Sequence, residues 1–262
     1  MLEKLVEISG VSREALEPEI QKIFQKHRTT EYAFLIEELP SLRKKHPKKD
    51  LTIVYKDAIN AYSSARNQTL RLYPGVFNAL EKIKSKGCKV VVFTESMGFY
   101  TLRRLKKLGL DGTLDFVYSP PDHNRPKGSE RYYEEKAYEF EKTIHRFTPK
   151  GEYKPNADIL LSIISAEGIN SVPEQSIYIG DSLMKDVKMA QDAHIIDVYA
   201  KYGVATNSDA YIALRKVTHW TKEDVEREKK ISAGGVVTPN FILENSFEEI
   251  FNYFEFTPRK IK

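Results

Sequence analysis

Two aspartates follow an apolar run in the segment "SIYIGDSLMKDV". Asp181 follows the apolar residues 177–179 after one glycine, and Asp186 lies five positions later, near the start of the next helical pattern. Mg²⁺ prefers carboxylate oxygen and is often held by one or two carboxylates together with water and substrate phosphate. Gly180 is expected to permit a tight turn before them. A helix cap is the simpler alternative for such an aspartate, but G-D-S-x-x-x-D after an apolar strand favours a metal site of Asp181 and Asp186.

Two other segments carry groups that could bind an anion. Thr94 follows the apolar run 90–93 and offers a hydroxyl, and the amides of Glu95 and Ser96 are expected to be free at the next turn. Lys154 precedes Pro155 before an amphipathic pattern, where an ammonium can neutralise a phosphoryl group and the charge that develops on it. Each signal alone is weak, because threonine often caps helices and surface lysines are common. Their order before Asp181 predicts a phosphate site.

The segment "GLDGTLDFV" at 109–117 also has the residue types of a reactive centre. However, the residues before Asp111, "LRRLKKLGL", have the pattern of an amphipathic helix that ends at Gly109. Asp111 would therefore lead into a strand, whereas reactive groups in an open α/β sheet follow the carboxyl ends of strands. We interpret this segment as a polar turn between a helix and a strand.

These groups need a sheet to position them, and the pattern after residue 71 predicts one. Pro74 and Gly75 open a helical segment that Gly87 ends, and apolar runs at 90–93, 115–119, 177–179 and 195–200 read as strands. The run at 90–93 is expected to be buried on both faces. Strands that alternate with helices at this spacing predict an α/β fold, an open Rossmann-like parallel sheet flanked by helices.

Residues 1–70 show helical periodicity instead. Ser12 is expected to cap a helix, and a helix is expected to stop near Pro40, which leaves the basic run 43–49 in a solvated loop. One apolar stripe contains Leu16, Ile20, Ile23 and Phe24, and a second contains Ile53, Val54, Ala58 and Tyr62. Farther on, helices are expected around 130–145, with a packing stripe of Tyr133, Ala137, Phe140 and Ile144, and behind a capping box of Thr221 and Asp224.

Composition limits the classes of partner. The chain has 41 basic and 37 acidic residues, a formal charge of +4, which is too small to argue for nucleic acid or an anionic membrane. The lysines near Lys106 and the run 43–49 leave a nucleic-acid partner as a weaker alternative, which predicts steep salt dependence. The single Cys88 excludes an intramolecular disulfide and Cys-rich zinc patterns, and is expected to pack as a small apolar residue. No signal peptide or long apolar run is evident, which predicts a cytoplasmic protein.

Taken together, Thr94, Lys154, Gly180, Asp181 and Asp186 resemble the second, third and fourth motifs of the haloacid dehalogenase (HAD) superfamily. The resemblance runs from about Tyr73 to the C-terminus and includes the closing segment "DVYAKYG". It implies a Mg²⁺-dependent phosphohydrolase that acts on a small phosphorylated substrate, with Thr94 and Lys154 as catalytic residues and Thr94, Glu95, Ser96 and Lys154 around the phosphate. It also implies that 1–70 is a helical cap and 71–262 the α/β core.

One part of the family pattern is missing. The family's nucleophile lies in a D-x-D phrase after a first strand, and no D-x-D occurs in these 262 residues. The resemblance implies that this strand belongs between the strands that end at Thr94 and Asp181. Either an N-terminal segment is absent, or direct pairing or another chain closes the gap, or the core is rearranged. We therefore expect an impaired phosphohydrolase or, alternatively, a non-catalytic phosphate-binding or regulatory module.

Overall fold

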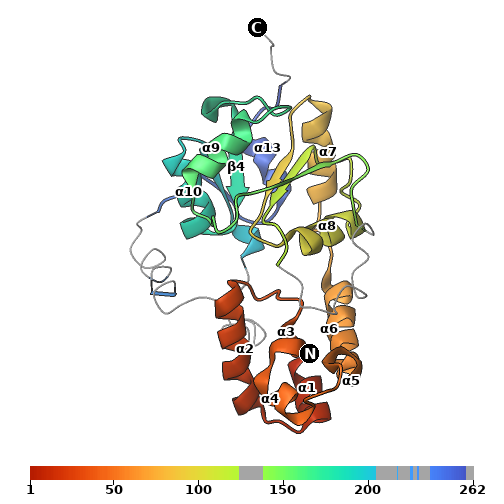
Figure 1. Ribbon diagram of the computed structural model, residues 1–262. Coiled ribbons are helices and arrows are strands. Elements are labelled where there is room, and N and C mark those ends of the chain that lie inside the picture. Colours follow the sequence, from red (N-terminus) through yellow and green to blue (C-terminus); the bar gives the residue numbers. More distant parts are fainter. Residues whose placement is uncertain (124–137, 205–216, 218–224, 227–228, 230–236, 258–262) are drawn as a thin grey trace. The chain divides into compact units, whose positions relative to one another are not determined.

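The computed structural model describes residues 1–123, 138–204, 217, 225–226, 229 and 237–257. The chain divides into two compact units, and Figure 1 traces both along the sequence. The first contains Met1–Arg71 and is helical; the second begins at Leu72 and contains every named strand. Within the described residues, none of the helices has the length and apolarity that a membrane crossing requires.

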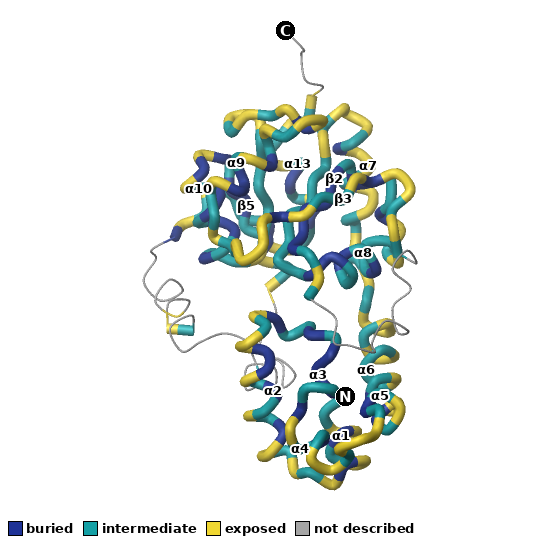
Figure 2. Tube along the Cα trace, viewed as in Figure 1, coloured by how far each residue is buried: buried dark blue, intermediate teal, exposed yellow. Residues whose placement is uncertain are grey.

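The helical unit consists of short helices around one apolar core (Figure 2). Its helices are α1 (Leu2–Ser9), α2 (Arg13–His27), α3 (Leu35–Glu38), α4 (Pro40–Lys45), α5 (Leu51–Val54) and α6 (Lys56–Thr69). The core includes Leu5, Leu16, Ile20, Ile23, Phe24, Leu35, Leu39, Leu42, Leu51, Tyr55 and Ala58. Each fully buried leucine stabilises the fold by roughly 1.5–3 kcal/mol. This confirms the first predicted stripe, and Ser12 caps α2 by accepting a hydrogen bond from the Ala15 amide at 3.3 Å.

Two expectations about this unit are wrong. A helix does stop near Pro40, since α3 ends at Glu38, but Pro40 also begins the next helix, α4, because proline has no N–H to lose at the first helical position. Arg43 and Lys45 are therefore helical and not part of a loop. Ile53 belongs to the predicted second stripe but does not pack in the core, because 64% of its surface is exposed. The helix breaks at Tyr55 between α5 and α6, so that a single 3.6-residue period cannot place both segments.

The second unit alternates strands and helices. Its first part contains α7 (Val76–Ser85), β1 (Val91–Phe93), α8 (Gly98–Lys107), β2 (Phe116–Ser119) and β3 (Ile144–Phe147). Its second part contains α9 (Ala157–Ser165), a 3₁₀ turn (Pro173–Gln175), β4 (Ile177–Gly180), a π-helical turn (Leu183–Val187), α10 (Lys188–Asp192) and β5 (Ile196–Ala200). The elements that follow are 3₁₀ turns (Lys201–Gly203, Phe247–Glu249), β6 (Phe241–Leu243) and α13 (Ile250–Tyr253). The predicted α/β class with parallel strands and flanking helices is confirmed.

The strands of the described residues form two parallel three-stranded sheets. Their orders are β1-β2-β3 and β4-β5-β6. In the first sheet Val92 pairs with Val117, which in turn pairs with His145. In the second, Ile179 pairs with Val198, and Val198 with Phe241.

The same helices cover both sheets. On one face, Leu160 of α9 belongs to one apolar cluster with Phe93 of β1 and Tyr178 of β4. On the other face, Ala79 of α7 belongs to a cluster that contains Val90, just before β1, as well as Ile177 and Ile179. Because side chains alternate between the faces of a strand, these clusters place β1 and β4 in one layer between two layers of helices.

The layer is interrupted between β1 and β4. Within the described part of the chain neither strand pairs with the other, and no strand pairs with both. All residues of β1 and β4 are only half-buried, whereas β2 is buried along its whole length. Both faces of 90–93 are packed against helices as expected, but these residues are only half-buried, because a strand without a described neighbour on one edge stays partly accessible. Direct pairing of β1 with β4, one of the ways to close the gap, does not occur here.

Two strands differ from the sequence-based expectation. The C-terminal end of the helix expected around 130–145 is strand β3, and Ile144 of the predicted packing stripe is 49% exposed. Residues 130–137 and the proposed capping box at Thr221 and Asp224 lie outside the described residues. Strand β6 has no counterpart among the predicted strands, because three residues are too few to show an alternating pattern. Cys88 packs with its apolar neighbours as expected, and burial raises the pKa of its thiol.

Candidate phosphate and metal site

The predicted phosphate residues lie at the carboxyl end of β1. The Thr94 amide donates to the carbonyl of Tyr118 in β2 at 3.0 Å, which extends the strand pairing by one residue. The Thr94 hydroxyl accepts a hydrogen bond from the Ser96 amide at 3.0 Å. Arg104 donates to the Ser96 hydroxyl at 3.0 Å, which directs a guanidinium to this turn. The Ser96 amide, expected to be free for an anion, is thus already used by Thr94.

Lys154 connects the ends of β1 and β4. Its amide donates to Glu95 Oε1 at 2.8 Å, and its ammonium donates to Asp186 Oδ1 at 3.0 Å. The ammonium also lies 4.7 Å from the ring centre of Phe93 and 5.3 Å from that of Tyr178, distances at which a cation is attracted to an aromatic face. Only 11% of its side chain is exposed. The sequence order that singled out Lys154 therefore corresponds to spatial proximity.

Asp186 lies at the centre of this arrangement. Besides Lys154, it accepts hydrogen bonds from the Ser182 amide at 3.1 Å and from the Tyr178 hydroxyl at 3.3 Å. The π-helical turn Leu183–Val187 holds it there, a geometry that is frequent at functional sites. A Cβ on Gly180 would collide with the Asp186 carboxylate. Glycine is therefore needed for this close approach, and not for the tight turn that the sequence suggested.

Asp181 differs from Asp186 in its surroundings. Its side chain is exposed, and it forms no ion pair with any described residue. Although the residue is accessible to solvent, the surrounding protein still desolvates its carboxyl group in part, and this, followed by the negative charge of Asp186, raises the pKa of that group above the ordinary value. Lys154 and Lys185 oppose this effect only in part. Asp181 is therefore a carboxylate whose charge is incompletely compensated by its neighbours.

The two carboxylates fit a hard divalent cation as a partial set of ligands. No group of three or more His, Cys, Asp or Glu side chains suited to a metal occurs among the described residues. Asp181 and Asp186 would therefore supply two ligands, and water and phosphate oxygens the others, which is common for Mg²⁺. The raised pKa of Asp181 supports this fit, because a cation relieves the repulsion between two nearby carboxylates.

Sequence reasoning missed two residues of this arrangement. Lys185 forms an ion pair with Glu95 at 2.5 Å, which ties the end of β1 to the turn after β4. Tyr178 is a half-buried strand residue whose pKa is raised, first by burial and then by the charge of Asp186. The position of Lys185 directly before Asp186 was a usable signal. Tyr178 had none, because a tyrosine in a strand is ordinary packing.

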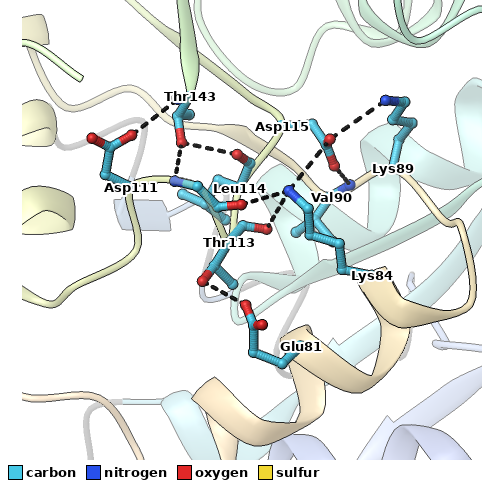
Figure 3. A network of polar contacts seen from close by, with 10 residues as sticks. Glu81, Lys84, Lys89, Val90, Asp111, Thr113, Leu114, Asp115 and Thr143 are labelled. Carbon is cyan, nitrogen blue, oxygen red and sulfur yellow. Dashed lines mark hydrogen bonds and ion pairs between the residues drawn. The ribbon is translucent and has the colours of Figure 1, made fainter. Parts of the chain in front are cut away.

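The segment around Asp111 is a closed structural turn (Figure 3). The Asp111 carboxylate accepts the amides of Glu141, Lys142 and Thr143 at 2.8–3.1 Å, directly before β3 begins. Burial alone would raise its pKa, but these three hydrogen bonds outweigh that effect and lower it. The hydroxyl of Thr143 donates to the Leu114 carbonyl at 2.8 Å. This agrees with the interpretation of the segment as a turn.

A second aspartate of the same segment holds the start of β1. Asp115 accepts the Val90 amide at 2.9 Å and lies 3.4–3.5 Å from the ammonium groups of Lys84 and Lys89 (Figure 3). Lys84 also donates to the Gly112 carbonyl at 2.6 Å. Both aspartates therefore act at the amino ends of the strands, opposite the end where Thr94 and Asp181 lie.

Comparison with known proteins identifies the family. The profile of the haloacid dehalogenase-like hydrolases matches residues 15–145, half of the chain. No curated protein matches. The solved structures that the chain matches include YfnB from Bacillus subtilis, a proposed HAD hydrolase bound to magnesium (14% identity, 95% of this chain and 86% of that chain covered, TM-score 0.48). A second is a HAD phosphatase from Thermococcus onnurineus (15% identity, 99% of this chain and 94% of that chain covered, TM-score 0.46). A third is 2-haloacid dehalogenase from Pseudomonas syringae (12% identity, 96% of this chain and 86% of that chain covered, TM-score 0.44).

The family profile spans both units, from α2 to β3, and so includes Thr94, Glu95 and Ser96. On the strength of this match, the chain belongs to the haloacid dehalogenase-like hydrolase family.

Proposed function

We propose that this chain binds a phosphorylated small molecule together with Mg²⁺ at the carboxyl ends of β1 and β4, and that it hydrolyses phosphomonoesters weakly or not at all. Thr94 and Lys154 would contact the phosphate, and Asp181 and Asp186 the metal. The observation that carries the proposal is the contact of Lys154 with both Glu95 and Asp186, which brings three segments distant in sequence to one place.

Each residue has a distinct role in this proposal. Lys154 is an ammonium held in a largely buried position, where its attraction to a phosphate oxygen is stronger than in water. The Thr94 hydroxyl would donate to a second phosphate oxygen while it continues to accept the Ser96 amide. When bound, Mg²⁺ would compensate the charge of the two aspartates and polarise the phosphoryl group. Glu95 and Lys185 would position Lys154 and the turn after β4.

Weak turnover follows from the missing nucleophile. An aspartyl-phosphate requires a carboxylate that attacks phosphorus. The 262 residues contain no D-x-D, and the Asp111 carboxylate already accepts hydrogen bonds from three backbone amides. We also propose that the helical unit 1–70 acts as a cap, because small helical units of this kind select substrates and exclude water.

The alternative is a binding or regulatory module without any catalytic activity. The same observations support it, since phosphate binding needs only the cation, the hydroxyl and the metal. Turnover separates the two proposals, whereas phosphate binding is common to both.

The test combines calorimetry with an activity assay. We expect inorganic phosphate to bind in the presence of Mg²⁺, Lys154→Met to weaken this binding by about tenfold or more, and the exposed control Lys150→Met to leave it unchanged. Absence of phosphate binding with and without Mg²⁺ would refute the proposal. Hydrolysis of a panel of phosphomonoesters that Asp181→Asn abolishes would reveal a nucleophile and refute weak turnover.

A further inference from the structure

Two tyrosines beside the candidate metal site have no role in the proposed function. Tyr202 lies in the 3₁₀ turn Lys201–Gly203, which follows the carboxyl end of β5. Tyr73 lies shortly before α7, and both tyrosines belong to the second unit. Their ring centres are 5.2 Å apart at an interplanar angle of 83°, the edge-to-face geometry that aromatic rings prefer. We call Tyr73 and Tyr202 the tyrosine pair.

The tyrosine pair adjoins Asp181. Because β5 pairs with β4 in parallel, the turns that follow these two strands lie at the same edge of the sheet. A Cβ built on Gly203 would be 3.4 Å from the Cβ of Asp181. Burial, followed by the interactions with Tyr73 and Asp181, raises the pKa of the Tyr202 hydroxyl to about 12. This hydroxyl is therefore neutral at physiological pH and does not repel an anion beside it.

Tyr73 is the accessible member of the pair. It is 53% exposed, whereas Tyr202 is half-buried and packs against the apolar cluster that contains Ala79 and Ile83 of α7. An edge-to-face contact with one neighbour covers at most one face of an aromatic ring. Because so much of Tyr73 remains exposed, its other face can receive a flat group from solvent.

The backbone holds Tyr73 in place. Its carbonyl accepts a hydrogen bond from the Val76 amide at 3.3 Å, which closes the turn that begins α7. Gly75 in this turn has a φ of 79°, and a Cβ at that position would collide with the side chain of Glu248. The turn is therefore fixed by its hydrogen bond and by this close packing. A ring that is held before binding loses little conformational freedom when a ligand stacks on it.

The tyrosine pair shares one end of the strands with the proposed phosphate residues. Thr94 follows β1, Asp181 follows β4 and Tyr202 follows β5. The charge of Lys201, next to Tyr202, is balanced by Glu244 at 2.7 Å. The pair itself offers a flat aromatic surface, on which nucleobases stack with little dependence on the base. A nucleoside monophosphate carries such a base and a phosphate in one molecule.

We propose that the tyrosine pair binds the base of a nucleoside monophosphate, which stacks on the exposed face of Tyr73 while the phosphate lies at Thr94 and Lys154. Tyr202 supports the ring of Tyr73, and the ribose lies between the base and the phosphate. This role rests on the proposed function and narrows its ligand to one substrate class. If the pair served only to pack α7 against the turn after β5, the base would add nothing to the affinity.

Calorimetry on the full chain with Mg²⁺ tests the base site with three ligands: inorganic phosphate, ribose 5-phosphate and adenosine 5′-monophosphate (AMP). The last two differ only in the base, so we expect AMP to bind about tenfold or more tightly than ribose 5-phosphate. If inorganic phosphate binds but AMP binds no more tightly than ribose 5-phosphate, the base site is refuted and the proposed function stands. If none of the three ligands binds, both are refuted.

Variants of Tyr73 locate the base. Tyr73→Leu should lower the ratio of the AMP and ribose 5-phosphate affinities to about one, and Tyr73→Phe, which keeps the ring, should preserve it. Tyr253→Leu is the matched control, because Tyr253 is 48% exposed and contacts Phe241 instead. A ratio that survives Tyr73→Leu, or that Tyr253→Leu also abolishes, refutes the base site. If circular dichroism shows that Tyr73→Leu fails to fold, Tyr73→Trp replaces it and should raise the ratio, because the larger indole stacks more strongly. An unchanged or lower ratio in Tyr73→Trp then refutes the base site.

Discussion

The two ends of the α/β unit use the same residue types for opposite purposes. At the amino ends of the strands, Asp111 accepts three amides and its pKa is lowered. At the carboxyl ends, Asp181 has no ion-pair partner among the described residues and its pKa is raised. Both aspartates adjoin a glycine in the sequence. The difference shows that the environment at each strand end, and not the local phrase, decides whether a carboxylate stabilises the fold or remains available to a ligand.

The largest effect is expected at the carboxyl ends, from Lys154→Met. This change leaves the Asp186 carboxylate, 9% exposed, without its cation, and breaking such a pair should lower the free energy of unfolding by about 3 kcal/mol. Urea denaturation measures it. The double variant Lys154→Met with Asp186→Asn should recover part of the loss. A loss no larger than that of the exposed control Lys150→Met would show that Asp186 does not depend on Lys154.

The second-largest loss of stability is expected at the amino ends of the strands, from Asp111→Ala. Asp111→Ala removes the acceptor of three amides and should cost about 2 kcal/mol of unfolding free energy. Asp181→Ala is the matched change at the other end and should alter stability by less than about 0.5 kcal/mol. Equal losses in the two variants would contradict the comparison.

The pH dependence should have opposite signs at the two ends. Asp111, with its lowered pKa, contributes stability above the unfolded value of about 3.9, and this is lost as pH falls through the folded pKa. Asp181, with its raised pKa, should make the protein less stable as pH rises from about 3.9 through the folded pKa. Stability profiles of Asp111→Asn and Asp181→Asn, each subtracted from the wild type, should slope in opposite directions. Slopes of the same sign would refute one assignment.

The smallest effect is expected from Mg²⁺ alone. Millimolar Mg²⁺ should raise the Tm of the wild type by a few degrees, because a ligand that binds only the folded state stabilises it. Asp181→Asn should remove this shift and Asp111→Asn should keep it. A shift that persists in Asp181→Asn would place the metal elsewhere.

Much of the fold could be predicted because its signals are local. The stripe of Leu16 and Ile20, the cap at Ser12 and the apolar run of β1 are visible in single windows of sequence. Ile53 and β3 could not be predicted in the same way. The break at Tyr55 shifts the helical phase, and β3 is held by contacts from Asp111 and Asp115, about thirty residues earlier in the chain.

The candidate site was likewise predictable only where the signal was local in the sequence. Residue types and order indicated Thr94, Lys154, Asp181 and Asp186. Their partners could not be derived, because the ion pair of Glu95 with Lys185 joins positions that no periodic pattern connects. The use of the Ser96 amide by Thr94 was also beyond prediction, since side-chain rotation decides it.

The interrupted layer has a consequence for hydrogen exchange. In β1, the Val92 and Thr94 amides turn toward β2, where Thr94 donates at 3.0 Å, whereas those of Val91 and Phe93 turn to the side on which no described strand pairs with β1. Amide protons should therefore exchange slowly at Val92 and Thr94 and faster at Val91 and Phe93. Three consecutive residues of one short strand would show protection that alternates with every peptide bond.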